Sequence, residues 1–264
     1  MILDELVAAT KKRVDKLYSD NLYDELKSKA YEIAKNEDDD KRFRFEKNLR
    51  NKPISFICEV KKASPSKGII AKDFDYTGIA KEYEKIGASA ISVLTEPDYF
   101  KGDINYLNEI SKNVNLPLLR KDFLIDEIMI YEAKVNNASA ILLICAILSD
   151  EEIKKYIEIA DSLGLSHIVE AHDEEEVLRA KNCGSRVIGV NNRNLKDFTV
   201  DINNSLRFRK LVDKDVIFVS ESGIKTPKDI KNLVDNNVNA VLVGETFMKA
   251  KDKKEMLDYL LSDC

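Results

Sequence analysis

Eight short apolar runs recur along the chain, and a stretch with apolar residues at helical spacing follows each of them. The runs are Ser55–Glu59, Ala90–Thr95, Leu116–Lys121, Ala140–Ile144, His167–Glu170, Val187–Asn191, Val216–Glu221 and Ala240–Gly244. Short, nearly continuous apolar runs are typical of strands that are buried on both faces of a parallel sheet. The pattern therefore predicts eight strand–helix units.

The spacing of these runs distinguishes between two parallel-sheet architectures. Their last residues lie between 21 and 36 residues apart, which accommodates a strand, a helix and two loops in each step. Eight such units in about 200 residues match a closed (β/α)8 TIM barrel. A doubly wound open sheet is the alternative. No G-x-G-x-x-G occurs among the nine glycines, so a dinucleotide-binding fold lacks its usual motif.

The first fifty residues have a different pattern, with two helical stripes separated from the first strand by a charged connection. The stripes are Leu3, Leu6, Val7, Val14 and Leu17, then Leu22, Leu26, Ala30 and Ile33, and the acidic connection is Asn36–Asp40. We expect a single domain over residues 1–264, with an N-terminal helical extension in 1–50 and the barrel in 51–264. Two helix starts are also predicted: Asp173 with Glu176 resembles a capping box, and Thr226-Pro227 places a cap before a proline.

Composition and charge exclude several classes of protein. Lys and Arg number 42 and Asp and Glu 47, so the net charge of −5 argues against a nucleic-acid binder. The longest apolar run, Ala140–Leu148, is too short for a membrane span of about 20 residues. No secretory signal begins the chain, so we expect a cytoplasmic protein without membrane contacts. Cys58, Cys145, Cys183 and Cys264 are widely separated, and the two histidines, His167 and His172, are too few to indicate zinc, so no metal site is predicted.

Polar side chains follow the predicted strands at the points where the chemistry of a barrel is located. Glu59 and Lys61 end the first strand, and alternate residues of a strand share one face, so both should point into the barrel mouth. Four further strands end in ionisable or amide side chains: Lys121, Glu170, Asn191 and Glu221. Solvated surface charges are the alternative interpretation. Carboxylates and ammonium groups that converge in a partly buried mouth are suited to acid–base catalysis.

A phosphate site is predicted from the glycines near the last two strands. Gly223 follows the seventh strand and Gly244 ends the eighth, where barrels often bind phosphate through backbone N–H groups. Ser64, in the loop after the first strand, adds a hydroxyl donor. Ordinary turns would explain each glycine separately.

Several motifs together resemble those of one enzyme family. Glu59-Val60-Lys61-Lys62-Ala63-Ser64-Pro65-Ser66 resembles the E-x-K-x-x-S-P-S motif of indole-3-glycerol phosphate synthase. Other matching motifs follow in the family's order: Val93-Leu94-Thr95-Glu96-Pro97, Phe100-Lys101-Gly102, Leu119-Arg120-Lys121-Asp122-Phe123, Val169-Glu170, Asn191-Asn192-Arg193-Asn194-Leu195, Ser220-Glu221-Ser222-Gly223-Ile224 and Leu242-Val243-Gly244-Glu245. The resemblance covers residue 50 to the C-terminus, and the N-terminal helices are similar to the family's extension.

The resemblance implies a reaction and a set of roles. Such enzymes convert 1-(2-carboxyphenylamino)-1-deoxyribulose 5-phosphate, a small phosphosugar, into indole-3-glycerol phosphate, carbon dioxide and water in tryptophan biosynthesis, without cofactor or metal. By motif, Lys121 resembles the general acid for ring closure, Lys61 the lysine that meets the substrate carboxylate, and Glu170 the acid–base residue of the final dehydration. Glu59 resembles the companion of Lys61. The spacing is compatible with either lysine as the donor of a given proton.

The remaining roles that the resemblance implies concern positioning and binding. Asn191 and Glu221 resemble positioning residues, while the substrate-binding residues are Ser64, Arg193, Ser222, Gly223, Gly244, Phe100 and Phe123, with Ser64 and the two glycines at the phosphate. Phe100, Phe123 and Leu143 are candidate walls for the substrate's aromatic ring, although barrel packing explains Leu143 equally well. Glu245 follows the phosphate-site glycine, and its carboxylate should point away from a bound dianion.

Two other hypotheses stay open at this point. One is another phosphosugar barrel enzyme, such as a phosphoribosylanthranilate isomerase relative, which would not require Glu59, Lys61, Lys121 and Glu170 together. The other is a non-catalytic phosphate-binding barrel that serves as a subunit or scaffold. The chain ends 20 residues after Gly244, which leaves room for a last helix, so we expect a monofunctional protein that is a monomer or weak homodimer.

Overall fold

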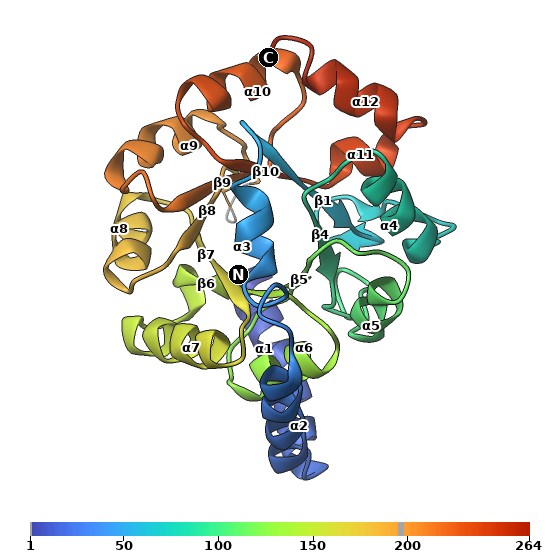
Figure 1. Cartoon of the computed structure of the whole chain (residues 1–264), viewed down its shortest axis with the longest axis vertical. Coiled ribbons are helices and arrows are strands. Elements are labelled where there is room, and N and C mark those ends of the chain that lie inside the picture. Colours follow the sequence, from blue (N-terminus) through green and yellow to red (C-terminus); the bar gives the residue numbers. More distant parts are fainter. Residues whose placement is uncertain (1, 195–197) are drawn as a thin grey trace.

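Each predicted apolar run forms one strand of a closed parallel barrel in the computed structural model, which describes residues 2–194 and 198–264. The barrel strands are β1 (Ser55–Val60), β4 (Ala90–Leu94), β5 (Leu118–Lys121), β6 (Ala140–Ile144), β7 (Ser166–Ala171), β8 (Val187–Asn191), β9 (Ile217–Glu221) and β10 (Ala240–Val243). β1 pairs with both β4 and β10, which closes the ring (Figure 1). The predicted (β/α)8 barrel is confirmed, and each strand lies within two residues of its predicted bounds.

Helices surround the barrel and connect its strands (Figure 1). They are α4 (Tyr76–Lys85), α5 (Asn105–Ser111), α6 (Ile128–Val135), α7 (Asp150–Ser162), α8 (Glu174–Asn182), α9 (Asn203–Phe208), α10 (Pro227–Asp235), α11 (Glu245–Lys249) and α12 (Lys253–Leu260), with 3-10 turns η1 (Cys145–Ile147) and η2 (Arg209–Leu211). A small antiparallel hairpin of β2 (Ala63–Ser64) and β3 (Gly68–Ile69) stands between β1 and α4. None of the described helices is long and apolar enough to cross a membrane.

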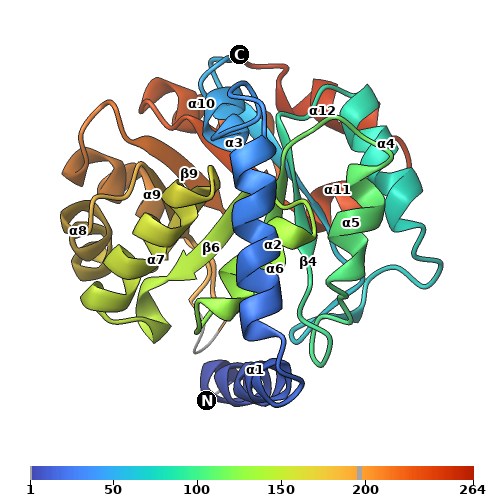
Figure 2. The same ribbon diagram turned by 60° about the horizontal axis from the view of Figure 1, so that its bottom comes forward.

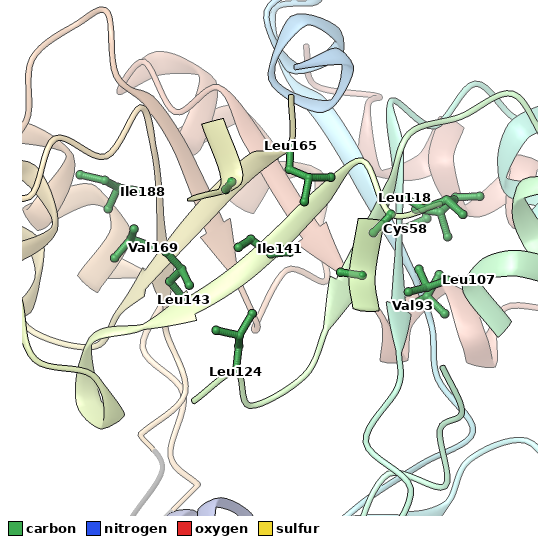
Figure 3. Packing of buried hydrophobic residues seen from close by; sticks show 14 of the residues in the cluster. Cys58, Val93, Leu107, Leu118, Leu124, Ile141, Leu143, Leu165, Val169 and Ile188 are labelled. Carbon is green, nitrogen blue, oxygen red and sulfur yellow. The ribbon is translucent and has the colours of Figure 1, made fainter. Parts of the chain in front are cut away.

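Alternation along the strands divides the apolar residues into an inner and an outer core. Ile57, Leu119, Leu142 and Val219 belong to a small inner cluster. Residues of the other register, Leu143 among them, pack between the strands and the helices. Figure 3 shows Leu143 beside Val169 in this outer layer. Leu143 was therefore wrong as a candidate wall of the substrate pocket, because its strand register directs it outward.

The N-terminal extension contains three helices, not the two that were predicted. They are α1 (Ile2–Ser19), α2 (Tyr23–Asn36) and α3 (Arg44–Leu49). Figure 2 shows α1 and α3 at opposite ends of the barrel, with α2 running along its side. The third helix was missed because six residues are too short to show a helical period. Its Phe45 and Leu49 belong to the inner cluster of the barrel and close the end opposite to the polar strand ends.

The two predicted helix starts differ in outcome. Thr226 forms a complete capping box with Asp229, and Pro227 occupies the first turn of α10. Asp173 caps α8 by accepting a hydrogen bond from the Glu176 N–H at 2.9 Å. The carboxylate of Glu176 does not return to Asp173 but accepts the N–H of His172 at 2.8 Å, so the predicted reciprocal box is only half formed.

Candidate active site

The carboxyl ends of the strands enclose a cavity of about 490 Å³, which is within the range of small-molecule sites. Apart from Leu143, every residue predicted for the site lines this cavity: Glu59, Lys61, Ser64, Phe100, Lys121, Phe123, Glu170, Asn191, Arg193, Glu221, Ser222, Gly223 and Gly244. Leu195, the last residue of one family motif, lies outside the described residues. The polar strand ends therefore converge as the alternation of the strands predicts.

Lys121 stands at the centre of the charged groups. Its Nζ lies 2.6 Å from Oε2 of Glu170 on β7 and 3.4 Å from Oε2 of Glu221 on β9. The side chains of Lys121, Glu170 and Glu221 are only 15, 4 and 3 % exposed. Because little water screens them, the three groups control one another's protonation.

The pKa values of this cluster move in opposite directions. Burial opposes the ammonium of Lys121, but the carboxylates of Glu170 and Glu221 outweigh it and raise its pKa. Burial likewise opposes ionisation of Glu170, yet Lys121 and His172 hold its pKa well below the usual range. Burial and the charge of Glu170 outweigh Lys121 at Glu221 and raise its pKa to about 7. Near neutral pH the cluster thus holds an ammonium, an ionised carboxylate and a carboxyl group that exchanges its proton.

Asn191 connects this cluster to the neighbouring loop. Its Nδ2 lies 3.3 Å from Oε1 of Glu170, and its Oδ1 accepts the N–H of Arg193 at 3.1 Å. The amide thus contacts Glu170 on one side and fixes the backbone of Arg193 on the other. Arg193 also donates from its guanidinium to the carbonyl of Phe198 at 3.4 Å, which holds its side chain at the cavity rim.

Lys61 and Glu59 form a second ion pair on β1 and the loop after it, with Nζ of Lys61 in direct contact with Oε1 of Glu59. Gly244, at the end of the neighbouring β10, leaves the room for this pair. A Cβ there would collide with Oε1 of Glu59 and lie 3.0 Å from Nζ of Lys61. A side chain at this position would therefore displace the Lys61–Glu59 pair.

Gly189 leaves room for the carboxylate of Glu221, and the sequence did not predict this role. It lies inside β8, and a Cβ would collide with Oε1 of Glu221 and come within 2.9 Å of Ile168 Cγ2. We expect Gly189→Ala to destabilise the fold by about 1–3 kcal/mol, the usual cost of overpacking, and to displace Glu221. Thermal unfolding and kcat/KM measure both effects. In a Glu221→Ala background the same change should cost less, and an unchanged melting temperature in the wild-type background would contradict the steric argument.

Other residues of the cavity lining provide cations and backbone suited to a phosphate. Ser64, Ser222 and Gly223 are among them, and the last two adopt positive φ angles of 67° and 89°. Lys67, Lys225 and Lys249 also line the cavity and were missed, since lysines are too frequent in the sequence to stand out. Glu245 lines the cavity as well, and its carboxylate pairs with Lys249 of the same helix at 2.5 Å.

Apolar side chains line the cavity beside the charged groups. Phe100 and Phe123 lie with ring centroids 6.1 Å apart, and Leu142 and Ile144 of β6 line the cavity where Leu143 was expected. The loop that carries Phe100 is held by the buried Glu96. Its carboxylate accepts three backbone N–H groups, from Asp98, Tyr99 and Phe100, at 2.8–2.9 Å.

Helix α1 contributes to the cavity, which the sequence did not predict. Ile2, Leu3 and Leu6 are among the lining residues. Arg13 binds the carboxylate of Asp122 with two nitrogens at 2.8 and 3.0 Å. Although Asp122 is buried, hydrogen bonding by Arg13 and the charge of Arg120 hold its pKa well below the usual range. This contact anchors α1 to the residue next to Lys121. A single arginine in a charged helix gives no indication in the sequence of such a contact.

Within residues 2–194 and 198–264, no group of three or more His, Cys, Asp or Glu side chains is arranged to hold a metal ion. Cys58, Cys145 and Cys183 are buried and Cys264 is exposed, all as free thiols.

Comparisons with known proteins agree with this geometry. The family model of indole-3-glycerol phosphate synthase matches residues 3–260. An indole-3-glycerol phosphate synthase of Endomicrobium trichonymphae is 54% identical over 258 residues, which cover 97% of this chain and 98% of the relative. That of Ruminiclostridium cellulolyticum is 52% identical over 252 residues, covering 96% and 95%.

Solved structures with low identity support the fold alone. A thiamine phosphate pyrophosphorylase of Pyrococcus furiosus superposes with a TM-score of 0.58 at 17% identity, covering 81% of this chain and 96% of that one. An N-acetylmannosamine-6-phosphate 2-epimerase of Clostridium perfringens gives 0.56 at 16% identity, covering 77% and 90%. The family match over nearly the whole chain and the relatives at about 50% identity lead to the same conclusion: this chain belongs to the indole-3-glycerol phosphate synthase family.

Proposed function

We propose that this chain converts 1-(2-carboxyphenylamino)-1-deoxyribulose 5-phosphate into indole-3-glycerol phosphate, carbon dioxide and water. It is a carboxy-lyase of tryptophan biosynthesis, as its family membership implies. The observation that carries the assignment of roles is Lys121, which contacts two buried carboxylates inside a cavity that also holds the Lys61–Glu59 pair. Of the three hypotheses that the sequence left open, the family match supports the first.

Lys121 is the general acid of ring closure in this proposal. An aromatic carbon of the substrate attacks the ketone carbon, and the ketone oxygen becomes a hydroxyl by taking a proton. Glu170 and Glu221 keep Lys121 in its ammonium form, so a proton is available at Nζ. Donation to the oxygen as negative charge develops there lowers the barrier. Glu221 can return a proton to the cluster because its pKa is about 7.

Decarboxylation and dehydration complete the reaction. The carbon–carboxylate bond breaks as carbon dioxide leaves, and its electron pair restores the aromatic ring. In the last step a base removes a C–H proton, and the hydroxyl group takes a proton from Lys61 and leaves as water. Glu170 is suited to act as that base because its neighbours keep it ionised. Lys61, held by Glu59, meets the substrate carboxylate and assists the loss of hydroxide.

The remaining residues bind and orient the substrate. Arg193 at the rim adds a cation for the carboxylate, while Phe100 and Phe123 hold the aromatic ring. Ser64, Ser222, Gly223 and Gly244 bind the phosphate, with the charges of Lys67, Lys225 and Lys249 nearby. Binding both ends of the substrate brings the aromatic carbon against the ketone, which reduces the entropic part of the barrier.

The N-terminal extension and the barrel together form one domain in this proposal. Support comes from α1, which lines the cavity, and from the Arg13–Asp122 clamp. Helix α2 packs on α6, where the buried Lys134 reaches Glu37 at 2.7 Å. A cytoplasmic location, the absence of nucleic-acid and membrane partners, and a monomeric or weakly dimeric state stay predictions from the sequence.

Complementation tests the proposed function in a cell. We expect the chain to restore growth without tryptophan in a bacterial strain that lacks its own indole-3-glycerol phosphate synthase. The same strain supplied with indole serves as the positive control, since it bypasses the missing step. Absence of growth despite soluble, folded protein would contradict the proposal.

A further inference from the structure

His172 follows the end of β7 directly and lies two residues after Glu170. Its imidazole stands between two carboxylates. Nε2 lies 3.3 Å from Oε1 of Glu170, and Nδ1 lies 3.2 Å from Oε2 of Glu176 at the start of α8. The side chain is only 16 % exposed and does not line the cavity, so it acts on the substrate only through Glu170.

Glu176 contacts His172 at Nδ1, the ring nitrogen that does not approach Glu170. Its Oε2 also accepts the backbone N–H of His172 at 2.8 Å, which fixes backbone and ring together. Glu176 is in the first turn of α8, where the helix dipole favours a negative charge. Asp173 caps the same turn by binding the Glu176 N–H at 2.9 Å. The ring therefore has a fixed position and a charged acceptor on its far side.

Each oxygen of Glu170 has a side-chain nitrogen beside it. Lys121 Nζ approaches Oε2 at 2.6 Å, and His172 Nε2 approaches Oε1 at 3.3 Å. Asn191 Nδ2 also lies 3.3 Å from Oε1, but an amide carries no charge. We infer that His172 is a positioning residue, an imidazolium held by Glu176 that keeps the Glu170 carboxylate ionised and oriented for the dehydration step. The inference rests on the proposed function only for the step it serves.

The surrounding charges agree with an imidazolium. Among the described residues, Glu170 of β7 and Glu176 of α8 face the ring, and Lys121 of β5 and Asn191 of β8 lie beyond Glu170. The thiol of Cys145 in η1 lies against the Glu176 carbonyl, and burial raises its pKa to about 12, so it is neutral. Burial opposes the charged ring, but the two carboxylates outweigh it and raise the pKa of His172 to about 10.

Nitrogen-15 NMR of histidine side chains reads this state without any enzyme assay. The chain has two histidines, and burial lowers the pKa of His167 to about 4, so it is neutral at pH 8. We expect one doubly protonated ring and one neutral ring in the native protein at pH 8. His172→Gln should remove the doubly protonated signal, which assigns it. A His172 that titrates near the ordinary value of about 6.5 would overturn the inference.

Kinetics of the same variant test the link to Glu170. Gln keeps a donor near the position of Nε2 but removes the charge. We expect His172→Gln to lower kcat about tenfold with little change in KM, because misorientation of a reacting group costs rate, not binding. Losing a cation raises the pKa of Glu170, so the acidic limb of the kcat profile should move to higher pH. An unchanged kcat and pH profile would overturn the inference.

Two further variants on α8 complete the test. Glu176→Gln keeps an oxygen for the His172 N–H but removes the charge that stabilises the imidazolium, so it should shift the acidic limb in the same direction. Glu175→Gln removes a charge from the same helical turn at an exposed position and should behave as wild type. An equal effect of both variants would contradict a specific role of Glu176. If the wild type lacked synthase activity, the proposed function would fail while the NMR result still decided the charge of His172.

Discussion

Replacement of Lys121 by Met is expected to lower kcat by about 10²–10⁴-fold, the usual contribution of general acid–base catalysis. Met keeps the length and packing of the side chain but has no proton to donate to the ketone oxygen. KM should change little, because the ammonium group acts mainly as the hydroxyl forms. Ring closure would then be slow in every turnover, so carbon dioxide and indole-3-glycerol phosphate should both appear slowly.

The Lys121→Met protein should still fold. The variant leaves Glu170 and Glu221 near each other without a cation, but the pair can take up a proton, because the pKa of Glu221 is already about 7. Circular dichroism and thermal unfolding check this point. Lys214→Met, at an exposed site before β9 and therefore at the other end of the barrel, is the matched control. More than about a tenth of the wild-type kcat in Lys121→Met would exclude Lys121 as the general acid.

Glu170→Gln is expected to lower the rate of product formation by a similar factor of about 10²–10⁴, but at a different step. An amide cannot accept the proton that is released in the dehydration, whereas Lys121 is still present for ring closure. A single-turnover experiment with a labelled substrate carboxylate separates the two events. Labelled carbon dioxide should be released well before indole fluorescence rises.

The two variants should differ in which products are delayed. Both products should be delayed together in Lys121→Met, but only the indole in Glu170→Gln. Glu158→Gln, an exposed carboxylate on α7, controls for loss of a negative charge. If carbon dioxide and indole were delayed equally in Glu170→Gln, Glu170 would act before or during decarboxylation, and its assigned role would be wrong.

The barrel and the first layer of the site were predictable because their signals are local. A buried parallel strand requires a short apolar run, so eight strands were located within two residues. Alternation then decides which side chains face inward, as for Glu59 and Lys61. Leu143 shows the limit: an apolar residue in an apolar run gives no information about its register, and its neighbours Leu142 and Ile144 line the cavity instead.

The parts that were missed depend on contacts between distant segments. Arg13 meets Asp122 across 109 positions, and nothing near either residue indicates the other. Gly189 is explained only by the carboxylate of Glu221 on the adjacent strand. Helix α3 is too short for a periodic pattern, and His172 shows its two carboxylate neighbours only once β7 and α8 are in place.

The most direct test of the central claim is an assay of the purified chain with 1-(2-carboxyphenylamino)-1-deoxyribulose 5-phosphate in the presence of EDTA. The rise of indole fluorescence is followed as the substrate concentration is increased, with no other additive. We predict a saturable rise, because the acid–base groups that the reaction needs are all supplied by the cavity around Lys121. A flat trace from folded protein would contradict the assignment and leave only the barrel and its cavity established.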